Sequence, residues 1–219
     1  MSVPPTPREE RVSRPGTHVA RATVPVFRQN ILEKQGWIRL SAKRYAGQFF
    51  SSKTSRFTPD SWEFPCCYLG CDFLTSTAEM FGDQLAARRN SNRTVLQIAS
   101  KEAKGLQYLS VTKFPALKLC DLTDATTRLR LNFETGSMMT PDLTIPQAWA
   151  EVIAVHKNQY DGIVYRSRHT DRRCVALWNR LGGRNLGSEL PFNFAGEFYR
   201  AFEAYELARS MGMRISFLL

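Results

Sequence analysis

Residues 160–179 read YDGIVYRSRHTDRRCVALWN, a stretch in which two apolar runs flank a polar and charged segment. The runs, Gly162–Ser167 and Cys174–Asn179, contain β-branched and aromatic residues and have the length of β-strands. The segment between them is typical of a turn. The stretch therefore predicts two strands that follow one another directly along the chain.

Similar short runs recur from Trp37 to the C-terminus. We expect further strands at Trp37–Leu40, Cys66–Asp72, Val95–Ala99, Leu106–Val111, Ala116–Leu122 and Arg214–Leu219. Helical spacing instead predicts helices at Thr77–Arg89, Ile145–Lys157 and Phe194–Met211. Many strands and few helices, without strict alternation of the two, predict a mixed α+β fold.

Specific residues support two of these helix predictions. The helix over Ile145–Lys157 follows Thr144, which we expect to cap it. The last helix is predicted because Phe198, Phe202 and Tyr205 stand at i, i+4 and i+7, the spacing of one helix face.

The length of 219 residues, of which 43% are hydrophobic, supports one compact domain with its own core. Residues 1–30 are rich in proline, arginine and glutamate and have few apolar residues at regular spacing. We therefore predict a flexible basic arm at residues 1–30 and a single domain at residues 31–219.

Composition excludes several classes of protein. Charged residues make up 23% of the chain, a normal globular share that argues against disorder throughout. No apolar run is long enough for a transmembrane helix, and the N-terminal residues lack the apolar stretch of a secretory signal. Five cysteines are an odd number, so we expect no disulfide framework. These features predict a soluble protein of the reducing cytoplasm with no membrane contact.

The net charge is +10, and the positive excess lies near the two ends of the chain, mostly as arginine. The sequence shows neither the basic helix face nor the mixture of basic and aromatic residues that nucleic-acid-binding proteins often have. A basic arm with a few basic loops explains the charge as well as a phosphate-binding role does. The excess of arginine favours a compact anionic ligand, because guanidinium matches the geometry of phosphate oxygens.

The cysteines and glycines form no recognisable metal or nucleotide motif. Cys66, Cys67 and Cys71 lie in one predicted strand, where neighbouring side chains face opposite sides, and no CxxC pair occurs. We therefore expect no bound metal. Leu181–Gly187 reads LGGRNLG, which has neither P-loop nor dinucleotide-binding spacing, and we interpret it as an ordinary loop.

Three segments gain meaning when they are read in order. The first is RLSAKRY at Arg39–Tyr45, followed by Ser55-Arg56-Phe57; the second is CYLGCDFLTSTAE at Cys67–Glu79; the third is the stretch at 160–179. Between the second and the third lie KLCDLTDA at 118–125 and IPQAWAEVI at 145–153. This order resembles the RES-domain family, which is named for its arginine, glutamate and serine. Its known members are NAD-consuming toxins of bacterial RES–Xre toxin–antitoxin pairs, and the resemblance covers roughly residues 37–180.

The resemblance implies a set of site residues. The catalytic residues that it implies are Glu79, Arg56, Ser167 and Arg44, and the substrate-binding residues are Tyr45 and Tyr68. Arg44, with Tyr45, matches an Arg-Tyr pair of the family, and Arg56 matches an arginine that precedes an aromatic residue. The two arginines compete for the same family positions.

Each residue also has a purely structural interpretation. Ser76-Thr77-Ala78-Glu79 fits a capping box, in which Glu79 bonds the start of its own helix. Ser167 fits a strand-end serine that leads into a turn. Tyr68 fits a half-buried strand residue, and the arginines fit surface charge. The functional interpretation is favoured because all of these residues occur in the order of one family.

The resemblance implies an enzyme that breaks the nicotinamide–ribose bond of NAD. Nicotinamide leaves as a neutral ring, so no second carboxyl is needed to protonate the leaving group, in contrast to ordinary glycosidases. Glu79 would stabilise the oxocarbenium-like ribose, while the arginines clamp the pyrophosphate. Tyr68 or Tyr45 would form an aromatic wall, and Ser167 would position groups by hydrogen bonding.

The acceptor of the ADP-ribosyl group stays open at this point. Inorganic phosphate would make the chain an NAD phosphorylase, water an NAD glycohydrolase, and a protein side chain an ADP-ribosyltransferase. We favour phosphate, because a basic pocket raises the local concentration of anions. NAD is then the substrate, phosphate is a co-substrate, and no cofactor is required.

The resemblance also implies an ADP-ribosyltransferase-like fold, with two small β-sheets around a cleft flanked by helices, and a partner antitoxin of the Xre type. It implies no specific nucleic acid for the chain itself. Two alternatives remain, a catalytically silent module that binds a nucleotide in the same cleft and a basic nucleic-acid-associated protein.

Overall fold

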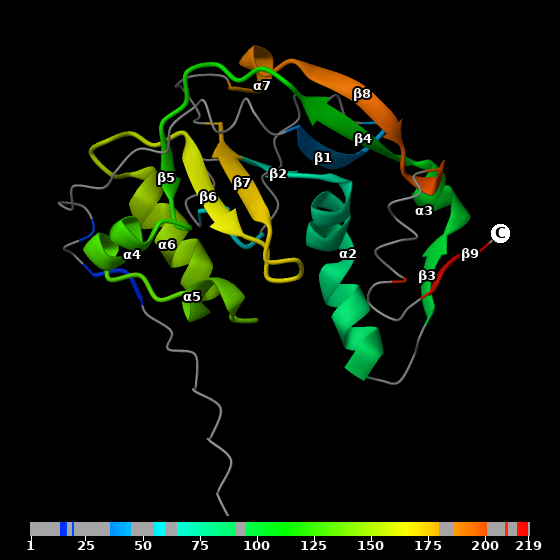
Figure 1. Ribbon diagram of the computed structural model, residues 1–219, viewed down its shortest axis with the longest axis horizontal. Coiled ribbons are helices and arrows are strands. Elements are labelled where there is room, and N and C mark those ends of the chain that lie inside the picture. The colour runs from blue at the N-terminus through cyan, green and yellow to red at the C-terminus, as the bar shows by residue number, and fades with distance from the viewer. Residues whose placement is uncertain are drawn as a thin grey trace, which may run out of the picture.

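The computed structural model describes residues 14–16, 19, 36–44, 55–59, 65–90, 95–179, 186–200, 209 and 214–218. These residues form an α+β fold, which confirms the predicted class (Figure 1). Most strands lie in one seven-stranded sheet, and two others form a separate parallel pair. The two sheets are therefore unequal in size, and the expected ADP-ribosyltransferase-like arrangement of two small sheets around a cleft stays a prediction.

The seven-stranded sheet is antiparallel at every pairing except the parallel one between its first two strands. In spatial order its strands are β5 (Leu119–Asp121), β6 (Gly162–Arg166), β7 (Arg173–Trp178), β2 (Cys66–Gly70), β1 (Trp37–Ala42), β4 (Leu106–Val111) and β8 (Phe192–Glu197). The separate pair consists of β3 (Val95–Ala99) and β9 (Arg214–Leu218).

Strands β6 and β7 form the hairpin that residues 160–179 predict, and they lie well inside the sheet. Their register pairs Gly162 with Leu177 and Arg166 with Arg173. Alternate side chains of β7 enter different cores, since Trp178 packs in one cluster and Leu177 in another. Burial on both faces explains why the sequence of β7 is almost continuously apolar.

The described helices lie around this sheet. Their bounds are α2 (Phe73–Asn90), α3 (Ser100–Lys104), α4 (Ala125–Leu131), α5 (Gly136–Met139), α6 (Thr144–Ala154) and α7 (Leu186–Glu189). Figure 1 shows α4, α5 and α6 gathered beside β5 and β6, with α2 on the other side of β7. No helix in the described part of the chain has the length and apolar character needed to cross a membrane.

Helix α6 confirms the predicted helix over residues 145–157, although it ends three residues earlier. Trp149 and Ile153 are almost completely buried in the core, and the Trp149 ring meets that of Phe133 at 4.9 Å between centroids. Thr144 does not cap the helix but is its first residue, and its N–H donates to the carboxylate of Asp142 at 2.9 Å. An aspartate accepts this bond more strongly than a hydroxyl would.

The predicted helix over Phe194–Met211 is wrong at its start. Residues 192–197 form β8, which pairs with β4, and Phe198 begins a short 3₁₀ helix, η2 (Phe198–Arg200). The buried Phe198 ring packs on Phe81 and Tyr108, so pairing and core packing override the helical spacing. Phe202 and Tyr205 lie outside the described residues.

Part of the predicted arm touches the core. Within residues 1–30 the structure describes only residues 14–16 and 19, and Val19 is fully buried in the cluster that also contains Trp149. The boundary at residue 30 stays a prediction. Val19 shows that a segment before this boundary contributes an apolar side chain to the domain.

Candidate functional site

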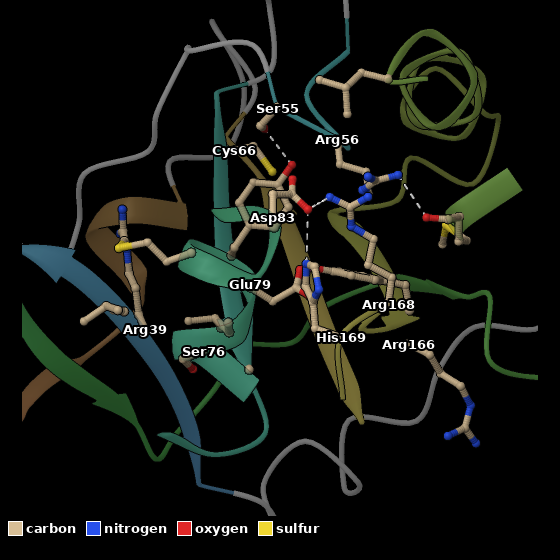
Figure 2. Close-up of a pocket in the computed structure, with 18 residues that line it drawn as sticks. Arg39, Ser55, Arg56, Cys66, Ser76, Glu79, Asp83, Arg166, Arg168 and His169 are labelled. Carbon is tan, nitrogen blue, oxygen red and sulfur yellow. Dashed lines mark hydrogen bonds and ion pairs between the residues drawn. The ribbon is translucent and has the colours of Figure 1, made fainter. Parts of the chain in front are cut away.

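A cavity of about 380 Å³ opens between α2, the β6–β7 hairpin and strands β1 and β2. Its volume is in the range of sites for small organic ligands. Charged side chains from four segments line it, namely Arg39, Arg56, Glu79, Asp83, Arg166 and Arg168 (Figure 2). Arg56 and Arg168 face Glu79 and Asp83 there, whereas Arg39 lies over Phe192 and Arg166 bonds Asp171. Two arginines are therefore placed to bind an anionic ligand.

Glu79 reaches the cavity because α2 begins earlier than predicted. The Asp72 carboxylate accepts the N–H of Thr75 at 2.7 Å, which starts the helix at Phe73. Glu79 therefore lies in the second turn, and the capping-box interpretation is wrong. The hydroxyl of Ser76 bonds the carbonyl of Ile38 at 2.7 Å and ties α2 to β1.

Tyr165 of β6 holds the Glu79 carboxylate. Its hydroxyl donates to Oε2 of Glu79 at 2.6 Å, and the tyrosine is 2% exposed. Burial raises the pKa of Tyr165 well above its ordinary value, so the phenol keeps its proton and donates it. The sequence analysis assigned no role to Tyr165. A polar-tipped residue inside a strand buried on both faces was the signal that could have identified it.

The two terminal guanidinium nitrogens of Arg56 differ in their hydrogen bonding. Nη1 donates to the carbonyls of Met138 at 2.9 Å and Thr140 at 2.8 Å. Nη2 is buried and bonds no described residue. Burial lowers the pKa of Arg56, although nearby Glu79 opposes this effect. A buried N–H without an acceptor is costly, so the geometry suits a ligand oxygen at this position.

Aromatic residues fix the loop that carries Arg56. The N–H of Phe57 donates to the hydroxyl of Tyr68 at 2.8 Å, and the indole N–H of Trp178 donates to the Phe57 carbonyl at 2.9 Å. Tyr68 also lines the cavity, its hydroxyl bonds Ser55 at 2.7 Å, and its role in substrate binding stays a prediction. Tyr68 therefore both borders the cavity and holds the loop beside it.

Ser167 is fully buried and does not line the cavity. Its hydroxyl oxygen accepts the N–H groups of His169 at 3.2 Å and Thr170 at 3.3 Å. These bonds shape the turn between β6 and β7, and the neighbouring Arg168 and His169 reach the cavity. The geometry matches the structural alternative of a strand-end serine that leads into a turn.

The same turn is fastened to α2 at the mouth of the cavity. Asp83 pairs with Arg168 and lies 3.5 Å from Nε2 of His169. Gly82 makes this approach feasible, because a β-carbon there would overlap the His169 ring. Burial and the charge of Arg168 both lower the pKa of His169. Figure 2 shows these side chains converging beside Glu79.

The first motif contributes a different arginine from the one expected. Arg44 is exposed in the turn after β1 and is not among the residues that line the cavity. Arg39, within β1, is 8% exposed and does line it, with its guanidinium 5.7 Å from the centroid of the Phe192 ring. Strand pairing of Arg39 with Leu109 sets this placement. Tyr45 lies outside the described residues.

Comparisons with known proteins agree with this architecture. The family model described as "RES domain" matches residues 34–194. No curated protein matches the sequence. Among solved structures, the chain is similar to one in the crystal structure of the M. tuberculosis MbcT–MbcA toxin–antitoxin complex, with a TM-score of 0.56 and 12% identity. The match covers 90% of this chain and 98% of that one. At this identity the similarity is one of fold.

Proposed function

The chain belongs to the RES-domain family, and from this premise we propose that it is an NAD-degrading enzyme that breaks the nicotinamide–ribose bond. The observation that carries the proposal is the buried Nη2 of Arg56, which bonds no residue that the structure describes and belongs to the cavity that contains Glu79. A pyrophosphate oxygen supplies the acceptor that this nitrogen lacks, and a carboxylate nearby suits a cationic ribose.

The proposed chemistry needs one free carboxylate. When the glycosidic bond breaks, its electron pair leaves with nicotinamide, and positive charge develops on the ribose. Glu79 faces the cavity with Oε2 held by Tyr165, so its charge is available to this cation. Asp83 is engaged by Arg168 and is not needed as an acid, because the leaving ring is neutral.

The remaining site residues serve binding in this proposal. Arg56 and Arg168 bind the pyrophosphate, and Tyr68 borders the bound ligand. Ser167 acts through the backbone, since its hydroxyl orders the turn that carries Arg168 and His169. Of the two arginines in the first motif, Arg39 borders the cavity and Arg44 does not, and the Arg39 guanidinium lies over Phe192.

The acceptor we propose is inorganic phosphate, which makes the enzyme an NAD phosphorylase. The cavity is rich in arginine, and an oxocarbenium-like ribose reacts readily even with a weak nucleophile. Hydrolysis by water and transfer to a protein side chain are the alternatives.

We further propose that the chain is the toxin of a toxin–antitoxin pair that acts in the cytoplasm. The family match and the similarity to a chain from a toxin–antitoxin complex support this role. An antitoxin of the Xre type is the partner that the family resemblance suggests. An ADP-ribosyltransferase-like arrangement around the cavity belongs to the same proposal.

The deciding experiment incubates the protein with NAD in phosphate-free buffer and again with millimolar phosphate, and identifies the products. Release of nicotinamide with a phosphorylated ADP-ribose that depends on phosphate supports the phosphorylase. Equal rates and plain ADP-ribose indicate hydrolysis instead, and turnover that requires a protein acceptor indicates a transferase. No release of nicotinamide under any condition contradicts the NAD-degrading function and favours a silent binding module.

A further inference from the structure

Tyr165 occupies a place from which one side chain touches both halves of the proposed site. It lies in β6, which has β5 on one side and β7 on the other, so hydrogen bonds on both sides fix its backbone. Its side chain is almost fully buried. A residue held in this way has little freedom to follow a moving neighbour.

The hydroxyl of Tyr165 acts on the carboxylate. It donates to Oε2 of Glu79 at 2.6 Å, while Oε1 makes no hydrogen bond to any residue that the structure describes. A short O–H···O⁻ bond of this kind is among the stronger hydrogen bonds in proteins. It fixes the rotation of the carboxylate and leaves the second oxygen for a ligand.

The ring of Tyr165 acts on the arginine loop. It packs against Phe57 with ring centroids 4.5 Å apart, and Phe57 directly follows Arg56. The backbone of Phe57 is also fixed by two hydrogen bonds, one from its N–H to the Tyr68 hydroxyl and one from the Trp178 indole to its carbonyl. The position of Arg56 therefore depends on the aromatic surface that Tyr165 provides.

We propose that Tyr165 is a positioning residue that sets the Glu79 carboxylate and the Arg56 guanidinium in one fixed relationship. The proposal rests on the proposed function and adds a residue to it. Tyr165 does not react; it holds the charge that stabilises the ribose at a constant distance from the group that holds the pyrophosphate. Preorganisation of this kind acts mainly on the transition state.

The test is Tyr165→Phe, which keeps the ring and removes the hydroxyl. We expect kcat for nicotinamide release to fall about 10- to 100-fold with KM changed by less than about threefold, because Arg56 keeps its support while Glu79 loses its anchor. Tyr108→Phe is the matched control. Tyr108 is also fully buried, and its hydroxyl also bonds a side chain of α2, that of Thr77 at 2.5 Å. The control variant should keep the wild-type kcat.

A double-mutant cycle separates positioning from loss of stability. In a Glu79→Gln background, Tyr165→Phe should cost little further activity, since the carboxylate on which it acts is gone. Melting temperatures of all variants confirm that each is folded at the assay temperature. A Tyr165→Phe variant with wild-type kcat, or one whose loss is matched by Tyr108→Phe or repeated in full in the Glu79→Gln background, overturns the proposal while the proposed function stands. A wild-type protein that releases no nicotinamide overturns both.

Discussion

Asp83 and Arg168 form an ion pair across the mouth of the cavity and join α2 to the turn between β6 and β7. Asp83 lies four residues after Glu79, so the helix that carries the proposed catalytic carboxylate also holds a cation of the site. An anionic ligand must compete with Asp83 for Arg168. The ion pair is therefore part of the binding equilibrium as well as part of the fold.

Replacing Asp83 tests this competition. In Asp83→Asn the guanidinium of Arg168 is released, and we expect KM for NAD to fall about two- to fivefold with little change in kcat. Glu197→Gln is the control, because it removes a carboxylate from an ion pair with Lys43, and neither of these residues lines the cavity. A rise in KM for Asp83→Asn would show that the pair orients Arg168 rather than occupying it.

Glu79→Gln tests the central carboxylate. The amide preserves shape and removes charge, so turnover should fall by about two to four orders of magnitude while the melting temperature changes little. Release of free nicotinamide from NAD is the measurement. Glu102→Gln, on the exposed surface of α3, should be indistinguishable from wild type. A Glu79→Gln variant with half the wild-type rate contradicts the assignment.

The two arginines that the sequence could not separate differ in the structure. Arg56→Lys replaces two separated guanidinium nitrogens by one ammonium nitrogen, which cannot lie both beside the two carbonyls and beside the ligand. KM for NAD should therefore rise about 10- to 100-fold, the equivalent of one charge-assisted hydrogen bond. Arg44→Lys, at the exposed turn after β1, should leave KM within about twofold. Steady-state kinetics of the pair of variants decides between them. If both variants raise KM equally, Arg44 also binds NAD.

His169 predicts part of the acid sensitivity of the fold. Its pKa is lowered from 6.5 by burial and by Arg168, which outweigh Glu79. The unfolded chain therefore binds more protons than the folded one below about pH 6.5, so this contribution to stability is complete above that pH and is lost as the pH falls. Between about pH 7.5 and 5, the melting temperature of His169→Gln should fall less than that of the wild type. If the melting temperatures of the two proteins fall in parallel with pH, His169 does not contribute to the loss of stability in acid.

The burial of Val19 predicts which part of the N-terminal segment contributes to the free energy of unfolding. Deletion of residues 1–13 should leave the free energy of unfolding unchanged, whereas Val19→Ala should lower it by about 1–3 kcal/mol through lost burial. Chemical denaturation measures both. If Val19→Ala unfolds at the same denaturant concentration as the wild type, the arm is dispensable up to residue 30.

The sequence predicts most strands of the sheet and the family motifs, because these depend on local pattern. An apolar run such as that of β7 predicts a strand whichever partner strand it pairs with. Phe198 shows the limit of such patterns, since its spacing suggests a helix while its ring is fixed by Phe81 and Tyr108 from distant segments. Helical spacing cannot reveal a strand whose partner lies far away in the sequence.

The same limit applies to the site, where residues in local motifs could be predicted and residues placed by tertiary packing could not. Glu79, Arg56 and Tyr68 could be found because each stands in a motif, and all three line the cavity. Tyr165 gave only the weak signal of a polar-tipped residue in an apolar strand, and Asp83 gave none, since both roles depend on the distance between α2 and the β6–β7 hairpin. That distance is set by tertiary packing and has no local signature.

Gly82 lets the turn between β6 and β7 lie close to α2. The His169 ring lies where a β-carbon would stand, so the absence of one side chain lets the hairpin turn approach α2. Alanine at this position should push the turn away from α2, because the nearest atoms to its β-carbon all belong to the His169 ring. The spacing between α2 and the hairpin turn is thus controlled at a position that contributes no side chain of its own to the cavity.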